Sequence, residues 1–565
     1  MRQPDDMLGW VVILRCDDAG MTITIPQGRP NKRFMRYVRP PVREKTTPLF
    51  PLRPETRPMR LGIDVESIPQ PPADGYLTGF LTRDEIQVHL LMPKGMDQPP
   101  DAWSTLLGKP VLHTVDFTTV TDAGRFMDAA EFHITTNTET EEGWSVARFF
   151  PIFQQFDEQS APADAPVLSL DERHTAAAYA AGAGAVEIDV IVTNRAAAGR
   201  TDVGDNDIVV TVTPDDAVAL IGHYLRVTSN PVVAIERGQL LGGGAWETTE
   251  STGTIVNSYL WGVTSAMTFF DFAAAHAAAA QGGPVCAEAF NSILIRLARA
   301  ARALDHMLAA LSNPLDKRRS DVVETAAEAF DRELLYLAAA FDIYGRLYAW
   351  LLDTSKDHKA VRNQSLDSRD FVNKLVQKQY DETLLDDVIR LQKYAWVCKH
   401  LRNHIHDGIL QVVPQPGRQY GNATNAALML GGIPHFAPEA GNLDQSHYDD
   451  LGVWMADPIS PFGPQVMSAD LATAGFTLMG AALEYVEAFT RLILCNKPNT
   501  MIAAEQAAAA KESTDETVTS EEDRAPAPSR FLGCVEGPLG HVDPEPPERA
   551  KFHRAIFGWH PASMV

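Results

Sequence analysis

The stretch FDRELLYLAAAFDIYGRLYAWL, Phe330–Leu351, decides the fold more strongly than any other part of the chain. Its large apolar residues recur at alternating steps of four and three positions: Phe330, Leu334, Leu337, Phe341, Tyr344, Tyr348 and Leu351. This spacing places them on one face of an α-helix and predicts a long amphipathic helix packed in a core. We expect the helix to begin near Ser320, because serine caps helix N-termini.

The same kind of spacing predicts a helical block from Pro284 to Pro414. Proline suits the first turn of a helix, so the first helix is expected to begin at Pro284. It should bury Phe290, Ile293, Leu297, Leu304, Leu308 and Leu311. A third helical region is expected over Ser368–Ile405, with a break near Asp381 or Asp386. A closing helix is expected to begin at Ser468 and to bury Leu478, Ala482, Val486, Phe489 and Ile493.

The region before the helical block predicts a mixture of strands and helices. Apolar residues alternate with a period of two in Val186–Thr193, and this pattern is typical of a strand. Further strands are expected at Ile208–Thr213 and Val232–Glu236. A helix is expected from Pro214, followed by acids that favour its positive end.

Two glycine clusters lie in this region, Gly182–Gly184 and Gly242–Gly244. The first precedes a strand, whereas a dinucleotide fingerprint follows one. The second lacks the Gly-Lys-Ser/Thr ending of a phosphate-binding loop. We interpret both as flexible turns and expect no nucleotide site.

These patterns predict an α+β, predominantly helical fold, in which a helical core and a smaller β-containing region form one large, irregular unit. The expected organisation has six parts: a Pro/Arg-rich extended arm (1–60), a mixed α+β region (61–255), the helical core (256–414), Pro/Gly-rich loops (415–467), a closing helix (468–497) and an acidic Ala/Pro-rich tail (498–565). The aromatic end of the tail, Phe552–Trp559, is expected to dock on the same or a neighbouring subunit.

Charge and cysteine content limit the function and the compartment. The formal net charge is −24, and an acidic surface repels phosphate backbones, which argues against general nucleic-acid binding. The five cysteines form no CxxC pair, which fits a reducing compartment. The N-terminus lacks the pattern of a signal peptide, and the apolar segment Tyr259–Ala280 carries Asp271 and His276, so we expect a buried helix and no membrane contact.

Histidines cluster in Cys398-Lys-His-Leu-Arg-Asn-His-Ile-His-Asp-Gly408. His400 and His404 are four positions apart and would share a helix face, which is the spacing of metal ligands. Zinc needs further ligands. The glutamate of an HExxH motif is absent, because Leu401 and Arg402 occupy the two positions after His400. We therefore predict no metal ion and no cofactor.

The same segment resembles the arginine- and histidine-containing motif of HEPN-type RNases, which are all-helical dimers. The resemblance implies that Arg402 stabilises phosphorane charge, that His406 acts as acid or base, and that Asn403 assists. Only three residues separate Arg402 from His406, whereas that family usually has four to six. RNA cleavage by these residues is one alternative function.

The texture of the whole chain resembles the capsid proteins of totivirus-like double-stranded RNA viruses. It rests on the arm Arg29–Arg43, the Ala-rich stretch Phe269–Ala280 and the tail Met501–Pro528. The resemblance implies a mainly helical shell protein that assembles with itself around an RNA genome, in a virion or host cytoplasm and without a catalytic centre. A protein-interaction scaffold inside the cell is a further alternative. RNA contacts are expected from the arginines of the arm: Arg29, Arg33, Arg36, Arg39 and Arg43.

Overall fold

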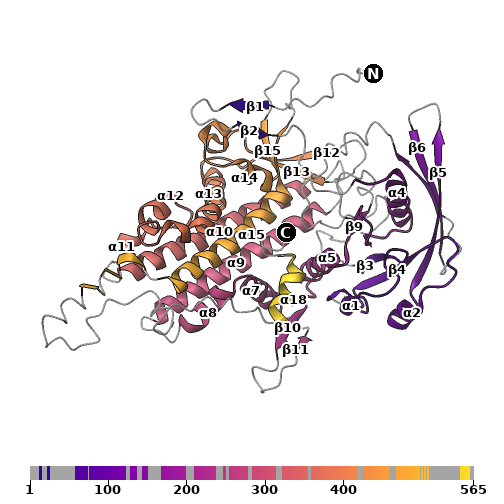
Figure 1. Cartoon of the computed structure of the whole chain (residues 1–565), viewed down its shortest axis with the longest axis horizontal. Coiled ribbons are helices and arrows are strands. Elements are labelled where there is room, and N and C mark those ends of the chain that lie inside the picture. The colour runs from indigo at the N-terminus through magenta and orange to yellow at the C-terminus, as the bar shows by residue number, and fades with distance from the viewer. Residues whose placement is uncertain are drawn as a thin grey trace.

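The computed structural model of the chain has a helical block and a mixed β-sheet that lie side by side along its longest axis (Figure 1). The C-terminal helix lies between them in this view. The structure describes residues 12–15, 22–25, 57–73, 75–122, 127–136, 143–149, 167–198, 209–236, 246–249, 254–277, 283–312, 321–353, 358–416, 424–456, 466–496, 498–500, 502–503, 506–507 and 548–559.

The largest sheet has seven strands in the order β7-β6-β5-β4-β3-β8-β9. Neighbours from β5 to β9 in this order are parallel, whereas β6 and β7 continue the sheet as antiparallel strands. Their bounds are β3 Met59–Asp64, β4 Ile86–Pro93, β5 Val111–Asp122, β6 Met127–Thr136, β7 Gly143–Phe149, β8 Val190–Val192 and β9 Val210–Val212.

Both faces of the parallel strands are covered. Val190 and Val192 of β8 belong to the large core shared with α1 (Leu77–Phe80) and α5 (Pro214–Val227), whereas Ile191 packs with α4 (Leu170–Ala185) on the opposite face. Such strands are apolar on both sides, which is typical of parallel sheets. The helix α2, Asp101–Leu107, connects β4 with β5.

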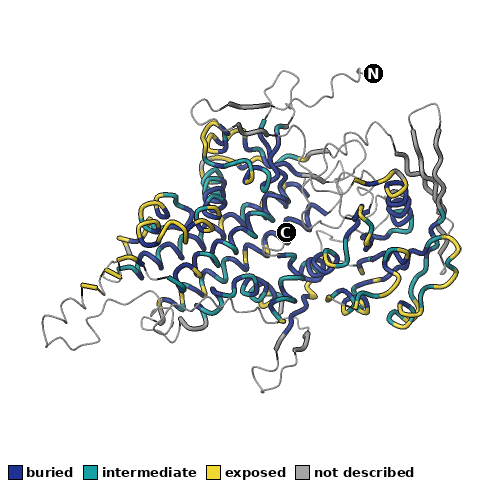
Figure 2. Tube along the Cα trace, in the orientation of Figure 1, coloured by how far each residue is buried: buried dark blue, intermediate teal, exposed yellow. Residues whose placement is uncertain are grey.

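The helical block contains the two long helices that the apolar spacing predicts. They are α9, Gly283–Leu311, and α10, Asp321–Leu352, and every apolar residue of both predicted faces is buried. Around them pack α7 (Thr254–Ala266), α8 (Thr268–Ala277), α13 (Asp386–Asp407) and α15 (Leu471–Cys495). Much of the length of these helices is buried, as the dark blue segments of the trace show (Figure 2).

The third helical region is broken, as expected. Short elements precede α13: α11 His358–Val361, α12 Arg369–Phe371, the π-helical turn Val372–Val376 and the 3-10 turn Glu382–Leu384. The long helix α13 begins at Asp386, one of the two predicted break points, and Asp386 and Asp387 lie in its positive first turn.

The segment expected to form loops contains a second sheet instead, so that expectation was wrong. Its four strands have the order β12-β13-β15-β14: β12 Val412–Pro416, β13 Thr424–Met429, β14 Val453–Ala456 and β15 Val466–Asp470. Pro414 and Pro416 lie in β12, an edge strand, where a missing N–H group is tolerated. The helix α14, Gln445–Asp450, and the 3-10 turns Pro434–Phe436 and Pro438–Ala440 fill the connection.

Three further predictions need correction. Ser468 does not cap the closing helix, because β15 continues to Asp470, whose Oδ1 accepts the N–H of Thr473 at 3.0 Å. Gly182–Gly184 lies in the last turn of α4, which is stabilised at its start by a capping box of Ser169 and Glu172.

The strand predicted at Val186–Thr193 is shorter, Val190–Val192. Val186 ends α4, and Glu187 has a left-handed backbone with φ of 62°, so the chain turns before the strand begins. The other strands and the helix at Pro214 are confirmed as β9, β10 (Val233–Glu236) and α5.

The C-terminal aromatic segment docks on the body, as predicted, through helix α18, Glu548–Phe557. Two hairpin pairs complete the described elements: β1 (Val12–Arg15) with β2 (Thr22–Ile25), and β10 with β11 (Trp246–Thr249). The arginines of the arm, Ser320, Gly242–Gly244 and most of Met501–Pro528 lie outside the described residues.

One continuous hydrophobic cluster joins the two halves of the fold. It runs from Leu61 and Val190 on the sheet, through Tyr224 of α5 and Phe557 of α18, to Phe341 in the helical block. The chain therefore has a predominantly helical α+β fold, in which the main sheet and the helical block share a core.

Candidate functional site

The first candidate site is the end of α13, where the histidines cluster. The ring of His400 lies 4.2 Å from that of Trp396 and 4.0 Å from that of His435, between ring centroids. The guanidinium of Arg369 lies 4.7 Å from the centre of the Trp396 ring. Burial, with nearby His435, Lys399 and Arg369, lowers the pKa of His400 to about 4. His400 is thus a neutral member of an aromatic stack.

His404 lies one turn after His400 on the same helix. Within the described part of the chain, no group of three or more His, Cys, Asp and Glu side chains has an arrangement that could hold a metal ion. The pair therefore has no third ligand among those residues. His435, which the sequence did not single out, stacks its ring beside the ring of His400.

Arg402 and His406 are brought onto one face of α13, because both lie within this helix and are four positions apart. His406 is exposed, whereas Arg402 and Asn403 are partly buried. The Nε atom of Arg402 is buried and has no hydrogen-bond partner among the described residues. The face thus presents an imidazole and a guanidinium together, and an acid–base step on a phosphodiester needs groups of these two kinds.

The second candidate site lies at the edge of the main sheet and was not predicted. From β3 the chain adds β4 and β5 on one side and later β8 and β9 on the other. The carboxyl ends of β3 and β8 therefore meet where the strand order reverses, the place where open α/β sheets commonly bind ligands. Asp64 ends β3, and Thr193 and Arg195 follow β8.

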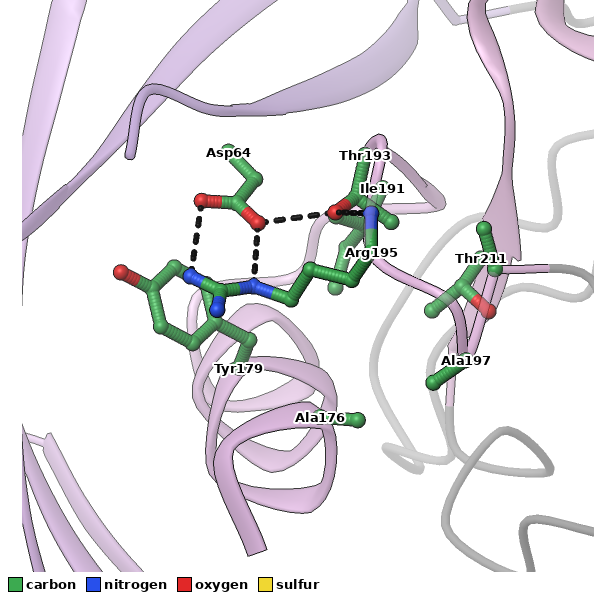
Figure 3. A pocket seen from close by; sticks show the side chains of 9 residues that line it. Asp64, Ala176, Tyr179, Ile191, Thr193, Arg195, Ala197 and Thr211 are labelled. Carbon is green, nitrogen blue, oxygen red and sulfur yellow. Dashed lines mark hydrogen bonds and ion pairs between the residues drawn. The ribbon is translucent and has the colours of Figure 1, made fainter. Parts of the chain in front are cut away.

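Asp64 is the centre of this sheet-edge cluster (Figure 3). Its Oδ2 accepts hydrogen bonds from Arg195 Nε at 2.7 Å and from Thr193 Oγ1 at 2.8 Å. Arg195 also donates from Nη2 to Glu66 Oε2 at 2.5 Å, and its guanidinium lies 5.0 Å from the centre of the Tyr179 ring. Arg195 thus bridges two carboxylates above an aromatic face of α4.

The guanidinium of Arg195 is paired with two carboxylates of the protein. Burial by itself would lower the pKa of Arg195, but its hydrogen bonds to Asp64 and Glu66 and the charge of Asp64 raise it above its ordinary value. Burial raises the pKa of Tyr179, and the charge of Asp64 adds to this. The cluster is therefore a guanidinium held between anions, beside a neutral phenol.

The cavity at this edge is small. The centre of a water molecule can occupy about 10 Å³ of it. It is lined by Asp64, Ala176, Tyr179, Ile191, Thr193, Arg195, Ala197, Ala198 and Thr211. A buried water needs roughly 10–15 Å³ by this measure, so the cavity has room for about one water. We conclude that the sheet-edge cluster ties two strand ends together and that its cavity, among the described residues, has room for about one water.

A third polar cluster, the Asp305 network, joins the sheet side to the helical block. Asp305 of α9 accepts hydrogen bonds from Arg226 Nε at 2.6 Å and from the Tyr259 hydroxyl at 2.8 Å, and its Oδ1 lies 2.9 Å from His223 Nδ1. Arg226 also donates to the carbonyl oxygen of Ile556 at 2.6 Å. These contacts connect α5, α7, α9 and α18.

The Asp305 network is removed from solvent. The side chains of Asp305, Arg226 and His223 are 4%, 1% and 0% exposed. Burial by itself would raise the pKa of Asp305, but Arg226 and His223 hold it well below its usual value. Burial, together with Asp305, raises the pKa of Tyr259. The network therefore connects these helices through buried hydrogen bonds and an ion pair.

The comparisons with known proteins identify no relative. No protein-family model, curated protein or solved structure matches the chain. Among the helices of the described residues, none is long and apolar enough to cross a membrane. Tyr259–Ala280, the segment considered for a span, contains most of α7 together with all of α8, with Met267 between the two helices.

Proposed function

We propose that this chain is a structural, self-assembling shell protein, capsid-like, that encloses an RNA genome and acts without a catalytic centre. The observation that supports it best is the continuous core that joins the main sheet to the helical block. Ligand pockets occur preferentially at interfaces between domains. Here apolar side chains and the Asp305 network occupy that junction, as suits a rigid building block.

The fold agrees with what the resemblance to totivirus-like capsid proteins implies, a mainly helical protein with a smaller β content. The charge of −24 is compatible with a shell wall that repels the packaged genome and keeps it mobile. The five arginines of the arm would supply local RNA contacts. Under this proposal the protein acts in a virion or in the host cytoplasm, and its main partner is itself.

Particle formation tests the proposal directly. Purified full-length protein should elute as a large species in size-exclusion chromatography and show closed, uniform particles in negative-stain electron microscopy. Mass photometry should give one dominant mass of many subunits. A monomer or dimer that persists at high protein concentration, across a range of salt concentrations, would contradict the proposal.

RNA cleavage stays as the alternative, favoured by one observation: Arg402 and His406 share a face of α13, and His406 is exposed. The test is RNA degradation by the parent, His406→Ala and Arg402→Ala, with folding checked by circular dichroism. Lys378→Ala, which removes an exposed cation outside α13, is the control. Equal cleavage by parent and both variants would exclude these residues as the catalytic pair.

A further inference from the structure

Helix α18 lies in a groove formed by α5, α7 and β10, which we call the α18 groove. Two glycines shape it. A Cβ atom at Gly222 of α5 would overlap the carbonyl oxygen of Ile556, and one at Gly262 of α7 would overlap the ring of Phe557. The groove therefore fits the backbone and side chains of this helix closely.

The apolar face of α18 is fully used in the groove. Phe552, Ile556 and Phe557 are 2–3% exposed. Phe552 contacts the ring of Tyr76 edge-on at 5.1 Å between centroids, and the guanidinium of Arg226 lies 3.7 Å from the centre of the Phe557 ring. An isolated helix of ten residues is unstable in water, so α18 is expected to fold as it docks.

The middle of α18 carries a buried histidine. His553 is 1% exposed, and its Nε2 accepts a hydrogen bond from the backbone N–H of Ala234 on β10 at 3.2 Å. Its ring lies edge-on to Trp261 of α7, at 5.7 Å between centroids. An imidazole that accepts at Nε2 is unprotonated there, because a protonated ring donates at both nitrogens.

Protonation of His553 is opposed by its surroundings. Burial, together with the positive charge of Arg549 on the same helix, lowers the pKa of His553 to about 4, against an opposing backbone hydrogen bond at Arg549. The neighbours recorded for this ring on β10 and α7 are a backbone N–H and an indole. A proton on His553 would thus place N–H against N–H in a buried site.

A second titratable group, Glu487, lies near the contacts that Arg554 of α18 makes with α7 and α8. Arg554 donates to the carbonyl oxygen of Ser265 at 2.5 Å and to the Thr268 hydroxyl at 3.2 Å, across the junction of α7 and α8. Glu487 of α15 caps α8 there, accepting the N–H groups of Phe269 at 2.8 Å and Phe270 at 3.0 Å.

Charge couples Glu487 to α18. The pKa of Glu487 is raised to about 7, because burial outweighs the backbone N–H groups and Arg554, which lower it. Tyr344 of α10 also faces this carboxylate, and Asp271 of α8 faces Arg549 of α18. When Glu487 takes up a proton, its attraction for Arg554 is lost.

We propose that the α18 groove is a docking site for a short amphipathic helix, filled by the chain's own C-terminal segment at neutral pH and vacated on acidification. Protonation of His553 removes the acceptor of the Ala234 N–H, and protonation of Glu487 removes its attraction for Arg554. The groove does not depend on the proposed shell function, and its occupancy can be measured on dispersed subunits or on particles.

The sign of the effect follows from proton linkage. Undocked His553 regains its ordinary pKa of 6.5, whereas docked His553 has a pKa of about 4, so the undocked state binds more protons between these values. Acidification therefore favours release. The difference corresponds to an approximately tenfold weaker docking equilibrium at about pH 5.5 from His553 alone.

Hydrogen exchange of the full chain, read by mass spectrometry on peptides that cover 548–559, tests the proposal. Rates at about pH 8 and pH 5.5 are corrected for intrinsic chemical exchange. We expect protection of α18 to fall about tenfold or more at the lower pH, while peptides from α10 stay protected. Unchanged protection of α18, or equal loss in α10 from global acid unfolding, would overturn the proposal.

His553→Gln separates the titration from the contact, because the glutamine amide oxygen can accept the Ala234 N–H without titrating. This variant should keep most of the protection of α18 at pH 5.5. When Glu487→Gln is combined with it, the difference in α18 protection between pH 8 and pH 5.5 should become smaller still. His435→Gln, at an exposed histidine remote in sequence from the groove, should behave as the parent.

One outcome for His553→Gln counts against the assignment. Release at the same pH as the parent would show that His553 is not the titrating group. If the variant fails to dock even at pH 8, His553→Asn is compared, and the parent's own pH response remains the deciding measurement.

Discussion

Asp305 in the helical junction and Asp64 at the sheet edge have the same kind of hydrogen-bond partners. Each carboxylate is buried and accepts hydrogen bonds from an arginine and a hydroxyl group. The arginine of the Asp305 network, Arg226, is 1% exposed, whereas Arg195 at the sheet edge is 25% exposed. The second carboxylate at the sheet edge, Glu66, is 52% exposed, so water screens part of that cluster.

The difference decides what each cluster contributes. Removing one partner from a fully buried ion pair leaves an uncompensated charge, which is strongly destabilising. At the sheet edge, solvent and Glu66 can compensate Arg195 when Asp64 is changed. We therefore expect the same substitution to have a large effect in the helical junction and a modest one at the sheet.

Asp305→Asn should have the largest effect. It leaves the buried guanidinium of Arg226 without its anion, and the free energy of unfolding should fall by about 3–5 kcal/mol. Urea unfolding followed by circular dichroism measures it. Asp387→Asn, whose side chain is 76% exposed in an ion pair with Arg390, is the control and should change it by less than about 0.5 kcal/mol.

Acid dependence sharpens the contrast. Because the folded-state pKa of Asp305 lies below its ordinary value of 3.8, its stabilisation is present above that value and is lost as the pH falls through and below it. The parent should therefore lose stability below about pH 4 more steeply than Asp305→Asn. Equal slopes for the two proteins would show that Asp305 is not held as an anion in the fold.

Asp64→Asn should have a smaller effect. Arg195 keeps its contact with Glu66 and is partly solvated, so the loss is that of charge-assisted hydrogen bonds, about 1–2 kcal/mol. Urea unfolding again measures it. A loss as large as that of Asp305→Asn would contradict the distinction between the two clusters and would mean that the sheet edge is as dry as the junction.

Glu66→Gln should have the smallest effect. Its carboxylate is half exposed, and exposed ion pairs contribute little, so we expect a change within about 0.5 kcal/mol. Adding Glu66→Gln to Asp64→Asn should cost more than the sum of the single changes, because Arg195 then loses both anions. Simple additivity would show that Arg195 does not couple the two carboxylates.

The long helices could be predicted because their signal is local. Phe330, Phe341 and Tyr348 follow a spacing that any helix-forming segment must show if one face is buried. The break before Asp386 and the docking of Phe552–Trp559 followed from composition in the same way. Proline and glycine were less reliable guides: Pro414 lies in an edge strand, and Gly182 lies in a helix.

The polar clusters could not be predicted, because their members are far apart in the chain. Asp64 and Arg195 come together only when β3 and β8 pair in parallel, and Arg226 meets Asp305 and Ile556 only when three helices pack. The local signal for the sheet edge was the apolar strand ending in Asp64. It had no meaning until the strand order placed Thr193 and Arg195 beside it.

The sequence by itself determined the helical class of the core, the burial of the α9 and α10 faces, and the choice of His400–His406 as a region of interest. Periodicity carries this information because helical packing repeats over a few residues. Only the tertiary structure decided that His400 stacks on His435, that the sheet is parallel at its centre, and that α18 is held by His553 and Arg554. Those contacts join distant segments, and their energies depend on burial, which a linear pattern of residue types does not record.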